Sequence, residues 1–276
     1  MSATSGRAHF RYDGPDSGIA VMSVEASRHR FPKHSHESYY IIGLMEEGAS
    51  YCYGPEQEES LAAAGDLFVI NPGQVHSGVP AGNTSVSYRM LSINRDRFAS
   101  LGRSVNDDET LLPEFPMRFK AAEDLCRLIR RTYALLDRSS PQLLTEETIL
   151  DLVAELLPHA SRDKALRLPP FTDHPGLRRA EELLSLDLEE NLDLSTIAAE
   201  AALSPYHFIR SFKRSYGLSP HKYRTQKRIG AAKAMLRQGV AAAEVAQRLG
   251  FYDQSHFSNA FHSYTGLTPR GYASGT

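Results

Sequence analysis

The chain has 276 residues, with 31 Lys and Arg against 33 Asp and Glu and a formal net charge of −2 at pH 7. This length exceeds that of one ordinary domain and predicts two, each able to bury its own core. The sequence has no run of roughly 20 apolar residues that would span a membrane, no apolar signal segment at its start, and two widely separated cysteines. These features exclude a membrane span and a disulfide framework, and they predict a cytoplasmic protein.

Residues 19–100 are predicted to form short strands. The segments 38–45, 49–53, 66–70 and 86–93 are rich in apolar and β-branched residues, and they are separated by turn-forming Gly, Pro, Asn and Asp. Short strands at this spacing predict a β-sandwich or barrel.

The pattern becomes helical after Pro116. Apolar residues at spacings of three and four over 119–136 predict a helix with one apolar stripe, and a second helix is predicted from a cap at Ser140-Pro141 to Pro158. Two interpretations are open for this pair. The helices form a hairpin within the domain, or residues 118–158 form the seam of a homodimer.

Residues 161–173 are charged and Pro-rich without periodicity, and they are the predicted linker. From residue 174 onward the pattern is helical throughout, and six helices are predicted. The third is capped by Ser204-Pro205, the long fourth begins at Ser219-Pro220, and the sixth is capped by Asp253.

This helical region contains an internal repeat. The segment YHFIRSFKRSYGLSP, residues 206–220, recurs 49 residues later as SHFSNAFHSYTGLTP. Each copy closes a unit of short helix, tight turn and second helix, which is the helix-turn-helix pattern of DNA-binding proteins. The helix that joins the units has about 20 residues and a length of roughly 30 Å, close to the ~34 Å between successive major-groove faces of DNA.

Positive charge is concentrated in the same region. Residues 174–276 hold 13 Lys and Arg against 9 Asp and Glu, whereas the rest of the chain has a net charge of −6. The segment 204–238 has nine basic residues and no acidic one. This surplus predicts a polyanionic partner, and together with the repeat it predicts double-stranded DNA.

The family resemblance of this region rests on two stretches, IAAEAALSPYHFIRSFKRSYGLSPHKYRTQKRIGAAKAML and VAQRLGFYDQSHFSNAFHSYTGLTPRGY. They resemble the DNA-binding domain of the AraC/XylS transcription regulators. The resemblance implies a regulator that binds a promoter or operator, works with RNA polymerase and more commonly activates than represses. This sequence departs from the family pattern at Ala202, where Gly is usual, and after Tyr272, where an Arg is usual.

Helical geometry and the resemblance together assign DNA contacts. Phe208 and Phe212 share the face expected to pack in the core, so the other face is available to DNA. The residues expected to read bases in the first unit are Tyr206, Ile209 and Arg210. Those in the second unit are Gln254, Ser255, Ser258 and Asn259. The residues expected to contact phosphates are Lys213, Arg214, Lys222, Arg224, Lys227 and Arg228.

The two units differ in charge. The first has Arg210, Lys213 and Arg214, and the second has Asn259, His262 and Ser263 at the matching positions. Because phosphate contacts supply much of DNA affinity, we expect the first unit to bind more strongly and the second to make a weaker, more promoter-dependent contact.

The N-terminal half resembles the cupin barrel through the stretches PKHSHESYYIIGLMEEG and AAGDLFVINPGQVHSG. A cupin-like domain of this kind precedes AraC-type DNA-binding domains, and the resemblance implies a pocket for a small-molecule effector. Aromatic walls with a few polar anchors are typical of such pockets. The residues predicted to line it are His34, His36, Tyr51, Tyr53, His76, Tyr88 and Arg89.

The histidines raise an alternative function. Metal-binding cupins supply three His and one Glu to a divalent ion. Here Tyr40 and Ile41 occupy the positions where the Glu is expected, and Glu37 would point to the other face of a strand. The alternative is therefore a cupin metalloenzyme, an oxygenase or isomerase with a helical accessory domain, that uses His34, His36 and His76.

The favoured prediction is an α+β transcription regulator of two domains, with no catalytic residue, metal or cofactor assigned. Residues 1–160 form a cupin-like barrel with a helical hairpin, which binds the effector and dimerises. Residues 161–173 form the linker, and residues 174–276 form an all-α domain of two helix-turn-helix units joined by a long helix. Effector binding is expected to shift the population between states that differ in DNA affinity.

Overall fold

The computed structural model describes residues 6–12, 18–53, 59–82, 84–105, 112–137, 142–161, 174–190 and 192–275. The chain divides into two compact units near residue 166. The predicted linker, apart from residue 161, lies outside the described residues. Within the described part of the chain, no helix is long and apolar enough to cross a membrane.

The N-terminal unit contains two β-sheets. The first has six strands in the order β1 (Arg7–Tyr12), β2 (Ile19–Ser27), β9 (Val86–Asn94), β4 (Tyr39–Glu47), β7 (Asp66–Ile70) and β10 (Arg118–Lys120). The second has four strands in the order β3 (Phe31–His34), β8 (His76–Pro80), β5 (Ala49–Tyr53) and β6 (Glu59–Ala63). Compactness alone groups residues 31–34 with the C-terminal unit. Because β3 is hydrogen-bonded beside β8, we assign it to the barrel.

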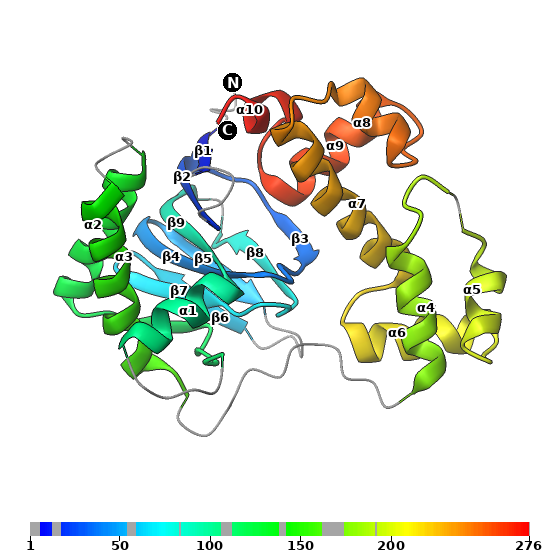
Figure 1. The fold of residues 1–276 in the computed structure, drawn as a ribbon, viewed down its shortest axis with the longest axis horizontal. Helices are drawn as coiled ribbons and strands as arrows, with labels where there is room; N and C mark the ends of the chain where they lie inside the picture. The colour runs from blue at the N-terminus through cyan, green and yellow to red at the C-terminus, as the bar shows by residue number, and fades with distance from the viewer. Residues whose placement is uncertain are drawn as a thin grey trace. The chain divides into compact units, whose positions relative to one another are not determined.

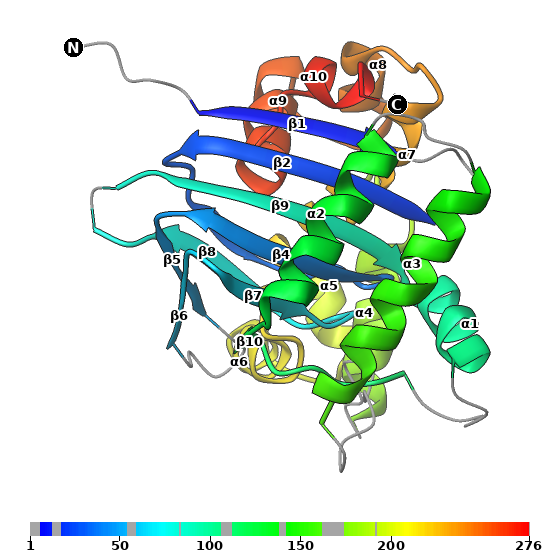
Figure 2. The same ribbon diagram turned by 90° about the vertical axis from the view of Figure 1, so that its left-hand side faces the viewer.

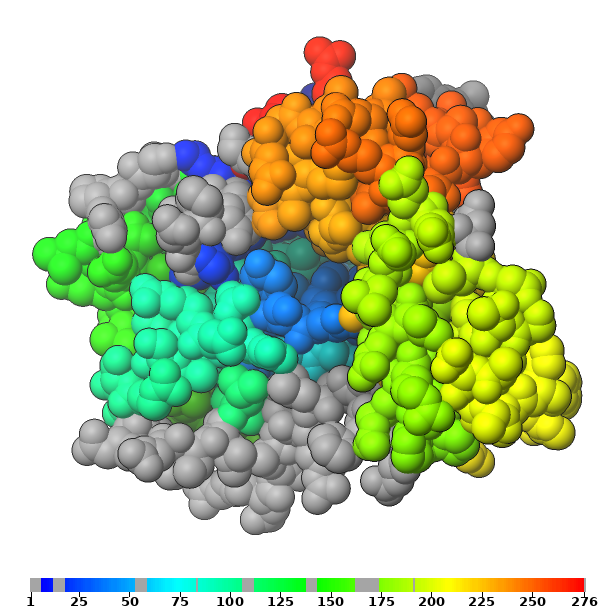
Figure 3. Space-filling view, turned by 45° about the vertical axis from the view of Figure 1, so that its right-hand side comes forward, coloured from blue at the N-terminus to red at the C-terminus, as the bar shows by residue number. Residues whose placement is uncertain are grey.

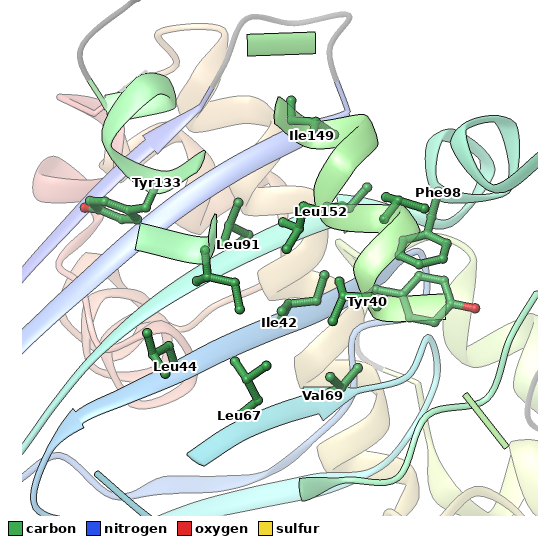
Figure 4. Packing of buried hydrophobic residues seen from close by; sticks show 14 of the residues in the cluster. Tyr40, Ile42, Leu44, Leu67, Val69, Leu91, Phe98, Tyr133, Ile149 and Leu152 are labelled. Carbon is green, nitrogen blue, oxygen red and sulfur yellow. The ribbon is translucent and has the colours of Figure 1, made fainter. Parts of the chain in front are cut away.

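Helices cover one face of the six-stranded sheet. They are α1 (Arg95–Val105), α2 (Glu123–Asp137) and α3 (Gln142–Leu156), followed by the 3₁₀ turn Leu157–His159. Figure 2 shows α2 and α3 lying across the sheet. Alternate residues of each strand face these helices, and the buried cluster in Figure 4 includes Tyr40, Ile42 and Leu44 of β4 with Ile149 and Leu152 of α3.

The predicted apolar stripe of 119–136 is used inside this unit. Leu125, Ile129 and Leu136 of α2 are buried in the same cluster as the sheet residues. This burial supports the hairpin interpretation, and a dimer contact through residues 118–158 would have to use the outward faces of α2 and α3. The cap predicted at Ser140-Pro141 lies outside the described residues.

The predicted start of the helix over residues 119–136 is wrong. Phe119 lies in strand β10, where it pairs with Leu67 at the edge of the sheet, and α2 begins four residues later at Glu123. Its spacing from Cys126 fits a helix, but backbone pairing with β7 decides its conformation. The ring of Phe119 stacks on His159 with a centroid distance of 4.5 Å, which ties the edge strand to the 3₁₀ turn after α3.

The C-terminal unit is entirely helical in its described part. Its helices are α4 (Pro175–Ser185), α5 (Leu194–Glu200), α6 (Pro205–Tyr216), α7 (Pro220–Arg237), α8 (Ala242–Arg248), α9 (Gln254–Thr265) and α10 (Pro269–Ala273). Figure 1 shows α7 running from the group α4–α6 to the group α8–α10. Its 18 residues give a length of about 27 Å.

The starts of three helices follow the predicted caps. The side chains of Ser204, Ser219 and Asp253 accept hydrogen bonds from backbone N–H groups of the first turns of α6, α7 and α9. Gly217 and Gly266 end α6 and α9 in the left-handed conformation, with φ of 71° and 73°. The internal repeat is therefore a repeat of structure as well as of sequence.

Candidate nucleic-acid interface and effector site

Helix α6 separates its core residues from its surface residues. Phe208, Phe212 and Tyr216 are buried on one face. On the opposite face, the predicted base-reading residues Tyr206 and Ile209 are 64% and 36% exposed, and Arg210 is also exposed. Figure 3 shows α5 and α6, in yellow, on the surface of the molecule. An exposed second helix on a fixed core is the geometry that enters the major groove.

Tyr206 and Arg210 are held together on this exposed face. The Nη1 atom of Arg210 donates a hydrogen bond to the Tyr206 hydroxyl at 3.2 Å, and the guanidinium lies 5.7 Å from the centre of the tyrosine ring. The residues are one helical turn apart, so the contact forms without any bend of the helix. It directs the Arg210 guanidinium along the exposed face of α6.

Helix α9 presents a polar but uncharged face. Gln254, Ser255 and Asn259 are exposed, whereas Ser258 is half-buried. Phe257 and Phe261 occupy the core positions that correspond to those of α6. Three of the four residues predicted for the second unit are therefore fully available on the surface, and Ser258 is only partly available.

The predicted phosphate-contacting residues fall into two groups. Lys213, Arg214 and Lys222 are exposed and remain candidates for phosphate contact. Lys227 is half-buried, and its Nζ lies 3.7 Å from a carboxylate oxygen of Glu181. This ion pair reduces the charge that Lys227 presents to DNA.

The structure corrects the role of Arg224. Its side chain is buried, at 7% exposure, and its guanidinium donates hydrogen bonds to backbone carbonyls at the end of α4 and beyond it. Burial lowers the pKa of the guanidinium through desolvation. A guanidinium enclosed in this way holds the fold and does not reach a phosphate. The acceptors are the carbonyl oxygens of Leu183, Leu184, Leu186, Asp187 and Glu190.

Arg228 has a similar structural role. Its Nε donates to the carbonyl of Leu188 at 2.8 Å, its Nη2 to that of Glu190 at 3.1 Å and its Nη1 to that of Gly250 at 2.9 Å. These contacts join α7 to the segment before α5 and to the turn between α8 and α9. We therefore remove Arg224 and Arg228 from the candidate phosphate contacts.

The interior of the barrel is lined by residues on the faces opposite the helices. Cys52 and Tyr88 pack there with Met45, Ala62 and Phe68. Burial raises the pKa of the Cys52 thiol to about 11 and also raises that of the Tyr88 hydroxyl, so both groups stay protonated near neutral pH. These five residues are mainly apolar, and the Cys52 thiol and the Tyr88 hydroxyl are the polar groups among them.

The three predicted histidines converge. Their ligand nitrogen atoms lie within 4.8 Å of one another, and the rings of His36 and His76 have centroids 5.2 Å apart. His76 precedes Gly78 by two residues, and Gly78 pairs with Cys52, so His76 faces the interior. Desolvation lowers the pKa of His76 to about 4, which keeps its imidazole neutral at pH 7.

Two predicted pocket residues lie elsewhere. Tyr51 is adjacent to Cys52 in β5 and therefore points to the opposite face, which it shares with its cross-strand partner Leu61, a residue that is 43% exposed. The placement of Tyr51 in the pocket is thus wrong. The side chain of Tyr53 lies outside the described part of the chain.

Arg89 also lies outside the barrel interior. It faces the helices, where it forms an ion pair with Glu46 and lies 5.6 Å from the centre of the Tyr133 ring. Glu46 is paired with Arg130 of α2 as well. Arg89 therefore belongs to an ion-pair network between the sheet and α2, and its prediction as a pocket residue is wrong.

The two units together define a class of protein. A barrel with a lined interior and a separate pair of helix-turn-helix units are the parts of a ligand-responsive, DNA-binding transcription regulator. Residues 17–153 match the family model of the AraC-like ligand binding domain, and residues 197–275 match that of a helix-turn-helix domain. The chain belongs to the AraC family of transcription regulators.

Individual relatives agree with this membership. The uncharacterized HTH-type transcriptional regulator YbfI of Bacillus subtilis (strain 168) is 30% identical over 242 residues, which cover 88% of this chain and 86% of YbfI. The HTH-type transcriptional activator RhaS of Shigella boydii serotype 18 is 24% identical over 266 residues, 92% of each chain. These relatives are transcription regulators rather than enzymes, which favours the regulator prediction over the metalloenzyme alternative.

A solved structure shows the same fold. ToxT of Vibrio cholerae strain SCE256, in a crystal structure with bound unsaturated fatty acid, has a TM-score of 0.58 and 14% sequence identity, with 99% of this chain and 96% of ToxT covered. At this identity the likeness concerns the fold alone, namely a β-rich N-terminal domain and a helical C-terminal domain.

Proposed function

We propose that this regulator reads an operator with α6 and α9 and activates transcription together with RNA polymerase in the cytoplasm when a small organic effector binds in its barrel. The observation that carries the DNA-binding part is the exposed face of α6, where Tyr206, Ile209 and Arg210 lie opposite a buried aromatic core. RhaS, a relative over most of the chain, is named an activator.

The position of the Arg210 guanidinium on the exposed face of α6 supports base reading by the first unit. Its contact with Tyr206 already orders the long side chain on the exposed face, so less conformational entropy is lost when the guanidinium binds DNA. A guanidinium can donate two hydrogen bonds to the O6 and N7 atoms of guanine. Lys213 and Arg214, in the last turn of α6, supply positive charge for the flanking phosphates.

The second unit makes a different contact. Gln254 and Asn259 can each bond the N6 and N7 atoms of adenine, but α9 carries no Lys or Arg. The contact of α9 therefore depends on the base sequence more than on phosphate charge. We propose unequal units, with α6 supplying most of the affinity.

The barrel interior favours an effector with an apolar body and a polar head. Phe68, Met45 and Tyr88 offer apolar contact, and the histidine cluster offers nitrogen atoms for a polar or acidic group. ToxT has been crystallised with an unsaturated fatty acid, a ligand of this general chemistry. The proposed pocket residues are His34, His36, His76, Tyr88 and Cys52.

The outward faces of α2 and α3 favour a homodimer. Arg127, which pairs with Asp124, and Arg131 are exposed on α2, whereas Glu146, Asp151 and Glu155 are exposed on α3. In a two-fold dimer, α2 of one copy can pack against α3 of the other with opposite charges facing each other. The buried stripe of α2 takes no part in this contact.

Binding to the DNA upstream of the protein's own reading frame tests the proposal. Arg210→Ala is expected to weaken sequence-specific binding by about 5-fold to 150-fold, since one bidentate base contact is worth roughly 1–3 kcal/mol. Arg103→Ala removes the same charge from an exposed position on α1 and serves as the control. Full sequence-specific affinity of the Arg210 variant would overturn the proposed base contact.

A further inference from the structure

The side chains of His34, His36 and His76 lie close enough together to be candidate ligands of one metal ion. His34 lies at the end of β3, His36 two residues later and His76 at the start of the neighbouring strand β8, so strand pairing brings all three together. Their ligand atoms lie within 4.8 Å of one another. Within the described part of the chain, no Cys, Asp or Glu joins this group.

Backbone hydrogen bonds set the tautomers of two of these residues. The Nδ1 atom of His34 lies 2.8 Å from the carbonyl oxygen of Pro32, and that of His76 lies 3.0 Å from the carbonyl oxygen of Gln74. A carbonyl oxygen only accepts, so each Nδ1 carries the proton. In the neutral ring, the lone pair is then on Nε2. Metal-binding histidines are commonly oriented in this way by a carbonyl.

The distances between the ligand nitrogen atoms of the three histidines are compatible with one bound metal ion after small rotations of the imidazole rings. Two nitrogen ligands of a tetrahedral Zn²⁺ ion, with bonds of roughly 2.0–2.1 Å, lie roughly 3.3 Å apart. The cluster therefore needs to contract by about 1.5 Å at its widest pair. His36, which is only half-buried, follows β3 in the connection to β4 and can make much of this adjustment.

The ligand set indicates which metals fit. Three imidazoles without a carboxylate suit first-row transition ions such as Zn²⁺, Co²⁺, Ni²⁺ or Cu²⁺, and they do not suit Mg²⁺ or Ca²⁺, which prefer oxygen. Ile41 lies on the interior face of β4, because Tyr40 and Ile42 face the helices. Ile41 also occupies one of the two positions where the cupin resemblance implies a carboxylate, and its apolar side chain offers no ligand atom.

We propose that His34, His36 and His76 bind one divalent transition-metal ion and leave a coordination position for water or for a donor atom of a ligand in the barrel. This metal site goes beyond the proposed function, which requires only DNA binding and an organic effector. A metal ion held by three histidines could bind a donor atom of the ligand directly. The barrel would then select a ligand by this donor atom as well as by its shape.

Metal binding to the full chain tests this inference. The purified protein is stripped with a chelator and titrated with Zn²⁺ by calorimetry, and Co²⁺ is added separately to record the visible absorption of a low-coordinate site. We expect one Zn²⁺ per chain and a rise in the melting temperature on binding. His36→Ala and His76→Ala are each expected to weaken Zn²⁺ binding by at least about tenfold.

Control variants separate binding at this cluster from binding of Zn²⁺ to surface histidines. His221→Ala removes an exposed histidine of α7 and is expected to bind Zn²⁺ like the unchanged protein. His36→Ala changes a half-buried residue and keeps the test open if the buried His76 variant does not fold. Absence of stoichiometric Zn²⁺ binding, or equal binding by the folded His36 variant, would overturn the inference. DNA binding measured on the same samples tests the proposed function separately.

Discussion

The guanidinium of Arg228 donates a hydrogen bond to the carbonyl oxygen of Gly250 at 2.9 Å and thereby ties the long helix α7 to the turn of the second helix-turn-helix unit. The same guanidinium bonds the carbonyls of Leu188 and Glu190, which precede the first unit. Arg228 thus contacts segments next to both DNA-binding units. Its position fixes how these units are oriented within the domain.

Replacement of Arg228 by Ala is expected to destabilise the C-terminal unit by about 2 kcal/mol, because three carbonyl groups lose a charged donor. Urea unfolding followed by helical circular dichroism measures this change. Lys222→Ala, at an exposed position of the same helix, is the matched control and should leave the free energy of unfolding unchanged within about 0.5 kcal/mol. Equal effects of both variants would contradict the structural role of Arg228.

Gly250→Ala is expected to destabilise the same unit by more than about 2 kcal/mol. The residue has a φ of 63°, and a Cβ atom there would lie 2.2 Å from the carbonyl oxygen of Glu189. Gly230→Ala is the control, since a Cβ at that helical position meets open space, and it should stabilise the helix slightly. The two melting temperatures should therefore move in opposite directions.

Ala202→Gly is expected to stabilise the protein by about 1 kcal/mol. Ala202 occupies the turn of the first unit with a φ of 55°, a left-handed conformation that costs an L-residue about 1 kcal/mol. Its side chain is exposed, so its removal leaves no cavity. Thermal unfolding of the variant checks the sign. A lower melting temperature would mean that the turn is not strained by Ala202.

The salt dependence of DNA binding separates surface cations from structural ones. Substitution of Lys213, Arg214 or Lys222 by Ala is expected to reduce the slope of log K against log salt by about 1 each, because each removes one phosphate contact. The exposed Arg248 of α8 lies outside the proposed contacts, and Arg248→Ala serves as the control. Unchanged slopes for all three variants would contradict their assignment as phosphate contacts.

The helix boundaries of the C-terminal unit were predictable because their signals are local. Ser204, Ser219 and Asp253 mark the starts of helices by chemistry that acts within one turn. Phe208 and Phe212, at a spacing of four residues, also identified the core face of α6. The exposed faces, and with them the candidate base-reading residues, followed from the same periodicity.

The pocket residues of the barrel were less predictable, because the alternation of side chains along a strand does not show which of the two faces is the interior one. Tyr51 and Arg89 were expected in the pocket, but one step along a strand moves a side chain to the other face. Only the packing of Cys52 with Tyr88, and of Arg89 with Glu46, decides which face is inside. The convergence of the histidines did follow from the motif that contains them.

The structural roles of Arg224 and Arg228 could not be predicted from amino-acid composition. Both belong to a block of nine basic residues, and the composition of that block does not distinguish a buried guanidinium from an exposed one. Their spacing of four places them on one side of α7, next to the buried Tyr223. This spacing was the available signal. Arginine also bonds several carbonyls at once, which lysine cannot do with the same planar geometry.

The most direct test of the account compares Arg210→Ala with Asn259→Ala in binding to several operator fragments. We predict that the Arg210 variant loses at least about fivefold in affinity at every operator, whereas the loss for the Asn259 variant is smaller and differs between operators. Equal and severe losses for both variants at all operators would contradict the unequal contribution of the two units, and no loss for either would contradict DNA reading by α6 and α9.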